Sequence, residues 1–112
     1  MSVTVKVLIP AKTAEATQTT QYTATGVTTI IDKFTATNYS AAAATISVNL
    51  VTAADTAGNQ NLITKTKSLQ PSEVYTFPEL VGQVLSPSAF ISTIAGTASA
   101  INIRASGREV TS

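Results

Sequence analysis

Apolar and polar residues alternate with a period of two along much of this 112-residue chain. Side chains of a β-strand point alternately to its two faces, so this period predicts half-buried strands. Turn-forming residues separate the alternating runs, and Pro10 is predicted to end the first. The runs are Val3–Ile9, 21–25, 28–38, 45–51, 61–69, 73–77, 89–95 and 100–105.

One segment changes period. Leu80, Val81, Val84 and Leu85 follow Pro78 at helical spacing and predict one short helical turn near 79–85. Seven to eight short strands with one such turn predict an all-β chain folded as an antiparallel β-sandwich, of jelly-roll or immunoglobulin-like topology. The length fits a single domain over 1–112, with 1–20 as an extended N-terminal strand or arm.

The predicted core is thin. Ile30, Phe34 and Ala36 are expected to face it from one strand, and the ring of Phe90 from another. Much of the apolar content is alanine, which buries little surface, so such a core stabilises an isolated chain only modestly. We therefore expect additional burial through self-association or through docking on a larger surface.

Composition excludes several kinds of chemistry. Cysteine and histidine are absent, which rules out disulfides, Cys or His metal sites and histidine-dependent nucleophiles. A net charge of +1 argues against a nucleic-acid partner. No apolar run is long enough for a transmembrane helix, and the first residues lack a basic segment typical of a signal peptide. We expect a non-enzyme with no cofactor, no metal and no small-molecule substrate.

Two polar groups are the remaining candidates for a site. Glu73 and Glu79 flank an apolar turn and are the best pair for acid–base hydrolysis of a glycoside, although solvated strand ends explain them more simply. Asp55, Asn59 and Asn61 lie in one loop that offers oxygen ligands for calcium, but their spacing does not match an EF-hand. A plain turn is the favoured interpretation of that loop.

Two groups of residues are candidates for a protein interface. A terminal strand can add to the sheet edge of a neighbouring protein. The residues proposed for this role are Val3, Val5, Val7 and Ile9. A basic stripe would dock on an acidic protein surface if its strands lie side by side. The residues proposed for that stripe are Lys65, Lys67, Arg104 and Arg108.

Four segments carry a resemblance to a known family. They are TTIIDKFTATN at 28–38, ATISVNLV at 44–51, LQPSEVYTFPELVGQVL at 69–85 and INIRASGREV at 101–110. Over about residues 20–110 the chain resembles small virion proteins of tailed bacteriophages, in particular the capsid decoration (cement or staple) proteins of short-tailed epsilon-fifteen-like phages. The resemblance implies a homodimeric β-sandwich, made in the host cytoplasm, that sits on the outer capsid surface and clamps neighbouring major capsid subunits.

A second function stays open. Similar β domains in phage tails and fibres bind carbohydrates or receptors, usually by setting aromatic rings against sugars. The candidate rings for such a platform are Tyr22, Tyr39 and Tyr75.

Overall fold

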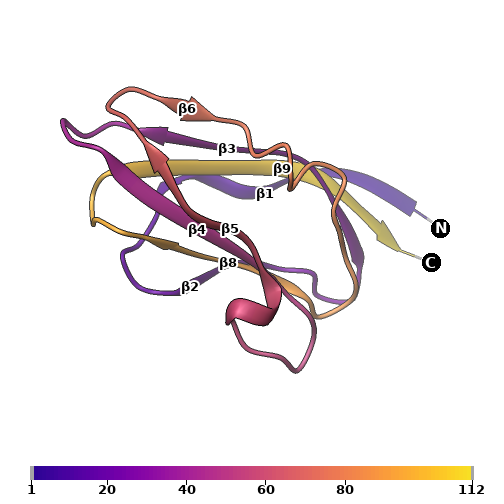
Figure 1. Ribbon diagram of the computed structural model, residues 1–112. Helices are drawn as coiled ribbons and strands as arrows, with labels where there is room; N and C mark the ends of the chain where they lie inside the picture. The colour runs from indigo at the N-terminus through magenta and orange to yellow at the C-terminus, as the bar shows by residue number, and fades with distance from the viewer. Residues whose placement is uncertain (1, 112) are drawn as a thin grey trace.

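The structure is a computed structural model that describes residues 2–111, and these residues form nine strands in two antiparallel sheets (Figure 1). A single turn of 3-10 helix, η1 (Asn59–Asn61), precedes the fifth strand. The strands are β1 (Ser2–Thr13), β2 (Thr19–Thr23), β3 (Thr28–Asn38), β4 (Ala44–Val51), β5 (Leu62–Leu69), β6 (Val74–Tyr75), β7 (Val84–Leu85), β8 (Phe90–Ala95) and β9 (Ile101–Thr111).

The strand order defines the topology. One sheet, here called sheet A, has the order β1-β9-β3-β6, with β7 also paired to β3, and the other, sheet B, has the order β2-β8-β4-β5. Strands from the two halves of the chain thus pair as β1 with β9, β2 with β8, β3 with β6 and β7, and β4 with β5. A long antiparallel hairpin rolled into two sheets gives this order, which is that of a jelly roll. The predicted antiparallel β-sandwich is confirmed.

The core lies between the two sheets and is built around two aromatic rings. Phe34 and Phe77 are fully buried and meet edge to face, with ring centroids 4.8 Å apart. The prediction for Phe90 is wrong, because this ring is only half-buried. Phe90 lies opposite Val51, whereas the next residue, Ile91, lies opposite Leu50 and is fully buried. Since neighbouring side chains of a strand point to opposite faces, Phe90 lies on the outer face of sheet B.

A β-bulge corrects the predicted faces of β3. The register shifts between Ile31 and Lys33, so Ile31 joins Phe34 on the core side, while Ile30 is half-exposed on the outer face. A bulge places two residues of one strand opposite one of its partner, and this reverses the alternation beyond it. Gly107 lies beside this bulge, where an added Cβ would come within 2.1 Å of the Ile30 carbonyl oxygen.

A second irregular region lies in β1. The register against β9 shifts between Val7 and Ile9, and both Leu8 and Ile9 are buried. Pro10 does not end the strand, which runs to Thr13. Proline is tolerated there because β1 is an edge strand and needs no hydrogen bond on its open side.

The predicted helical turn near 79–85 is not a helix. Two successive turns are closed by hydrogen bonds from Leu80 N to Phe77 O (3.0 Å) and from Gln83 N to Leu80 O (3.2 Å), and the chain then pairs with β3 as β7. Phe77 and Gly82 have positive φ angles, which turn the backbone out of the helical conformation. No helix in residues 2–111 is long and apolar enough to span a membrane.

Candidate protein-binding surface

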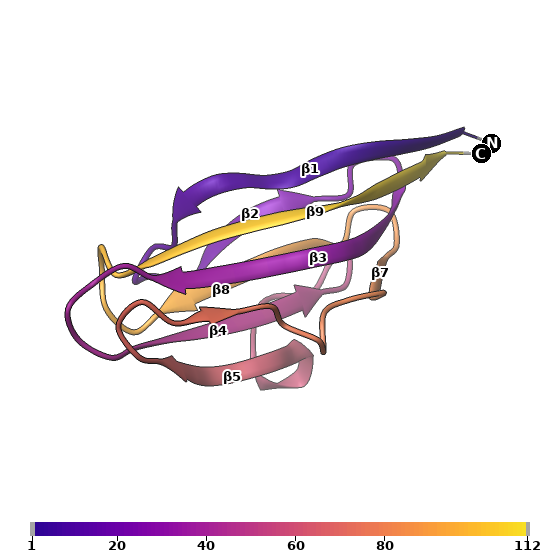
Figure 2. The same cartoon turned by 90° about the horizontal axis from the view of Figure 1, so that it is seen from above.

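The first half of β1 is bound to the fold almost entirely through its backbone. Every side chain from Ser2 to Val7 is exposed, whereas the next two, Leu8 and Ile9, are buried. β1 pairs with β9 on one side only, and the two strands run side by side to the two chain ends (Figure 2). Ser2–Val7 therefore forms part of one open edge of sheet A.

Apolar side chains gather on the outer face of this end of sheet A. Val3 lies opposite Val110, and the neighbouring row runs from Val5 through Arg108 and Ile30 to Val84. The exposed fractions are 83% for Val5, 56% for Val84, 53% for Val3 and 42% for Val7. We call this surface the valine patch; its residues are Val3, Val5, Val7, Ile30, Val84 and Val110.

An ion pair neutralises the charge of Arg108, which lies between Val5 and Ile30 within the valine patch. The Arg108 guanidinium donates to both carboxylate oxygens of Asp32, with Nη2 2.9 Å from Oδ1 and Nε 3.0 Å from Oδ2. Hydrogen bonding from Arg108 lowers the pKa of Asp32 below its usual value. Because each charge has its partner in the same fold, this surface requires no opposite charge from a binding partner.

A polar cluster joins the two sheets on the inner side of the same strands. The Tyr22 hydroxyl, from sheet B, donates to Glu109 Oε2 at 2.5 Å, and its oxygen accepts from the Thr29 hydroxyl at 2.6 Å. Lys6 Nζ lies 3.2 Å from the same Glu109 oxygen. Burial and the bond to Glu109 raise the pKa of Tyr22 to about 12, and the bond from Tyr22 lowers the pKa of Glu109. The end of the sandwich that carries the valine patch is thereby held closed.

The structure separates the residues that the sequence grouped as interfaces. Val3, Val5 and Val7 share one exposed face, but Ile9 is fully buried and offers no surface to a partner. The predicted basic stripe is wrong, because its lysines and its arginines lie in different sheets. Lys65 and Lys67 are on β5 of sheet B, while Arg104 and Arg108 are on β9, whose neighbours are β1 and β3.

The two candidate catalytic carboxylates serve as structural acceptors. Glu79 accepts hydrogen bonds from Thr64 and, at 2.7 Å, from the Tyr75 hydroxyl, and Glu73 accepts from the backbone N–H of Gln70 at 2.7 Å. Burial opposes ionisation of Glu79, but these hydrogen bonds outweigh it and lower its pKa. A glycosidase acid needs the opposite shift. Nothing in this arrangement favours acid–base catalysis.

Of the three candidate calcium ligands, Asp55 and Asn61 accept hydrogen bonds from donors of the protein itself. Asp55 accepts from the Thr56 N–H at 2.8 Å and from the Asn61 side-chain amide at 3.3 Å. Asn61 Oδ1 accepts from Asn49 Nδ2 at 2.8 Å and from the Gly58 N–H at 3.2 Å. These bonds fasten the loop over Asn49, which is only 3% exposed. Over residues 2–111, no group of three or more acidic residues, His or Cys lies close enough to hold a metal ion.

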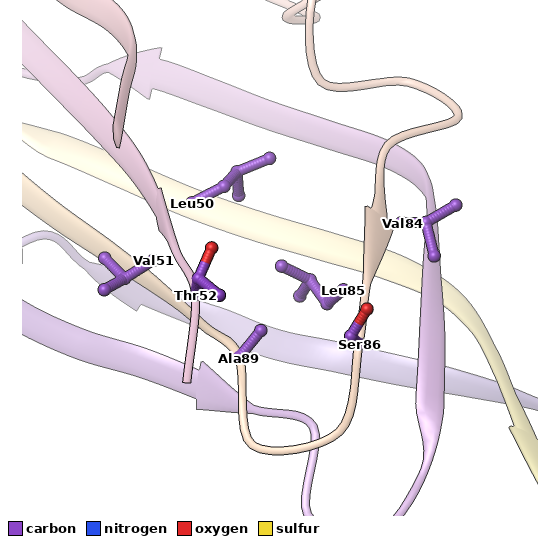
Figure 3. A pocket seen from close by; sticks show the side chains of 7 residues that line it. All are labelled: Leu50, Val51, Thr52, Val84, Leu85, Ser86 and Ala89. Carbon is purple, nitrogen blue, oxygen red and sulfur yellow. The ribbon is translucent and has the colours of Figure 1, made fainter. Parts of the chain in front are cut away.

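Two hollows on the surface of the described residues are small. One, of about 100 Å3, lies between the end of β4 and β7 and is shown in Figure 3. Aliphatic side chains and the hydroxyls of Thr52 and Ser86 line it, with no titratable group. Another, of about 130 Å3, lies on sheet B between Thr66 and Gly96. Pockets for small organic ligands usually measure ~300–1,000 Å3, so both are well below that size.

The three tyrosines do not form an aromatic platform. Tyr22 is buried, and Tyr75 packs against Phe77, with Lys67 Nζ 4.7 Å from the centroid of its ring. Tyr39 is exposed, at 51%. One accessible tyrosine ring gives little support to the alternative of a carbohydrate-binding module.

Comparison with known proteins assigns no family. No protein-family model, curated protein or solved structure matches this chain. The jelly roll, its valine patch and open edge, and the resemblance carried by the four sequence segments therefore remain as the observations that bear on function.

Proposed function

We propose that this protein is a structural virion protein that binds the outer face of a phage capsid and clamps neighbouring major capsid subunits. The observation that carries the proposal is the valine patch: four valines exposed by 42–83% on one face of one sheet end. Clusters of exposed apolar side chains of this kind often mark protein–protein contacts in soluble proteins. The resemblance to phage decoration proteins supplies the identity of the partner and the location on the virion.

The chemistry of the patch suits a shell of many identical subunits. Full burial of one valine side chain contributes about 1.5–3 kcal/mol before the costs of association are subtracted. Association costs ~4–15 kcal/mol, so burial of one small patch leaves only weak net binding. Two patches carried by one assembly of this chain bind more tightly than either patch alone, because the second contact becomes intramolecular once the first has formed. A clamp across two capsid subunits requires this bivalent geometry.

Electron microscopy of virions of the phage that encodes this chain tests the proposal. We expect density for the jelly roll on the outer shell, spanning neighbouring capsid subunits, with Val5 and Val84 in the contact. A shell whose outer face carries no such density, or a jelly roll that touches the capsid only through sheet B, would contradict it.

A further inference from the structure

The side-chain carboxylates of the chain are all engaged within the fold. Each of the six accepts at least one hydrogen bond from a donor of the chain itself. Three of them also form ion pairs, and their partners are Lys6, Lys12 and Arg108. The other four cationic side chains of the chain therefore have no carboxylate partner among the described residues.

The fold accounts for two of these four cations. Lys65 lies on β5, an edge strand of sheet B, where a lysine prevents unwanted pairing with another strand. Lys67 Nζ lies 4.7 Å from the centroid of the Tyr75 ring, in a cation–π contact. Lys33 and Arg104 have no such explanation, because they lie on β3 and β9, which are interior strands of sheet A.

Lys33 and Arg104 are neighbours on the outer face of sheet A, and we call them the cation pair. Lys33 pairs with Ser106, which is two residues along β9 from Arg104. Diagonal neighbours of this kind are ~7–8 Å apart, within reach of long side chains. Both side chains are exposed. Because two like charges at this spacing repel each other, an anion from outside the chain would stabilise both.

The cation pair adjoins the valine patch. Along β9, Arg104 is four residues from Arg108, whose row holds Val5 and Ile30 of the valine patch. Four residues of a strand span ~13 Å. Asp32 neutralises Arg108, whereas none of residues 2–111 forms an ion pair with Arg104. The outer face of sheet A thus changes from apolar and neutral to positively charged over this short distance.

We infer that the outer face of sheet A binds an acidic protein surface, with carboxylates of the partner at Lys33 and Arg104 and apolar side chains over the valine patch. This partner chemistry deepens the proposed function and rests on it, because it specifies the capsid surface that is bound. Exposed charges in an interface mainly steer the encounter and fix the register. The cation pair therefore selects the orientation, while the valine patch supplies the buried apolar area.

Two observations favour a protein over a nucleic acid as the partner. Nucleic-acid binding proteins commonly neutralise ~6–10 phosphates, whereas this face offers two unpaired cations. The neighbouring valines also need an apolar counterpart, which a phosphate backbone does not provide. Arg104 can bind a carboxylate through two parallel N–H···O bonds.

Binding to capsid shells that lack this chain, measured at two salt concentrations, tests the inference. The sheet A double variant, Lys33→Gln with Arg104→Gln, removes the cation pair. The sheet B double variant, Lys65→Gln with Lys67→Gln, removes the same charge from β5 and is the matched control. At ~50 mM NaCl we expect the sheet A variant to bind roughly fivefold more weakly than the control, and at ~1 M NaCl we expect equal binding, because charges are then screened beyond ~3 Å. Thermal unfolding checks that both variants are folded.

Cross-linking of the unmodified chain to the shells tests the same contact without a substitution. A water-soluble carbodiimide joins a lysine amine to a carboxylate that touches it. We expect peptide mass spectrometry to find Lys33 joined to an Asp or Glu of the capsid protein. Lys65, which is exposed on sheet B, should carry no such link.

The possible failures are distinguishable. Equal binding by the two double variants at low salt, without a Lys33 cross-link, overturns the inference and leaves the proposed function intact. An unmodified chain that does not bind the shells at all overturns the proposed function and the inference together. If the sheet A variant loses binding to duplex DNA but not to the shells, the cation pair serves a nucleic acid, and the inference is again overturned.

Discussion

The outer faces of the two sheets are treated differently by the fold. On sheet B, Asn49 and Ser92 are only 3% and 2% exposed, although both point away from the core. The loop 52–61 covers Asn49 through hydrogen bonds from its amide to Gly58 O and Asn61 Oδ1, and Gln18 donates to Ser92 at 2.7 Å. On sheet A, the valine patch has no such cover.

The difference shows which surface is left for a partner. Sheet B satisfies its polar groups with the chain's own loop, and among the described residues no buried side-chain nitrogen or oxygen lacks a hydrogen-bond partner. At the terminal end of sheet A, apolar side chains stay in water, which is unfavourable for a monomer. We interpret the covered face as structural and the uncovered face as the binding surface.

The largest expected loss of stability comes from a substitution in the core between the two sheets. Phe77→Ala should lower the free energy of unfolding by about 3–5 kcal/mol, because it removes a fully buried ring that packs on Phe34. Phe90→Ala, at a half-buried ring on the outer face of sheet B, should cost clearly less. Urea denaturation of both variants measures the difference. Equal losses would mean that the two rings share one core.

The hydrogen bonds that hold the loop 52–61 on sheet B can be removed by substituting Asn49. Asn49→Ala leaves the Asn61 side-chain oxygen and the Gly58 carbonyl without this donor, and a lost partner for a buried polar group costs about 1–3 kcal/mol. Loop amides from 52 to 61 should also exchange with deuterium faster. Unchanged exchange would show that the loop is held by other contacts.

The hydrogen bond between Tyr22 and Glu109, on the inner side of the strands that carry the valine patch, should make stability depend on pH. The folded pKa of Glu109 is lowered by its bond from Tyr22, so the stability it contributes is present above its unfolded pKa of about 4.3 and is lost as pH falls through the folded value. Tyr22→Phe should cost about 1.5–3 kcal/mol at pH 7, since a bond to a charged group is lost, and less at pH 3. Thermal unfolding at both pH values checks this. An identical loss at both would exclude the Glu109 carboxylate as the cause.

The smallest effect on stability is expected on the uncovered face. Val5→Ala should change the free energy of unfolding by no more than about 0.5 kcal/mol, because the side chain is 83% exposed and has little packing to lose. Chemical denaturation measures it. A loss above about 1.5 kcal/mol would indicate that Val5 packs within its own chain, which would contradict its assignment to a binding surface.

Periodicity predicted the strands well, because alternation depends on neighbouring residues alone. The segment 28–38 has the bounds of β3 as predicted, and the sandwich followed from the number and spacing of such runs. The inward and outward faces were predicted wrongly where a β-bulge changes the alternation, as at Ile30 and Ile31. The run near Val84 was mistaken for a helix because the positive φ angle of Phe77 is not evident from its residue type.

The candidate site was less accessible to sequence reasoning than the fold. Val3, Val5 and Val7 were found from their own alternation, but Ile30, Val84 and Val110 join them only through strand pairing over long sequence separations. The basic stripe was predicted wrongly for the same reason: the sheet to which β5 or β9 belongs depends on strand pairing over long sequence separations, which the sequence does not show. One signal is Lys6, because a lysine within an alternating apolar run is typical of an edge strand.

The most direct test of the account is a binding titration of purified chain onto capsid shells that lack it, with Val5→Asp compared against Val74→Asp. Both valines are exposed in sheet A, at 83% and 57%, but Val74 pairs with Thr37, seven residues along β3 from Ile30. We expect Val5→Asp to weaken binding at least tenfold and Val74→Asp to bind like the unmodified chain. Equal binding by the two variants would contradict the assignment of the valine patch as the capsid-binding surface.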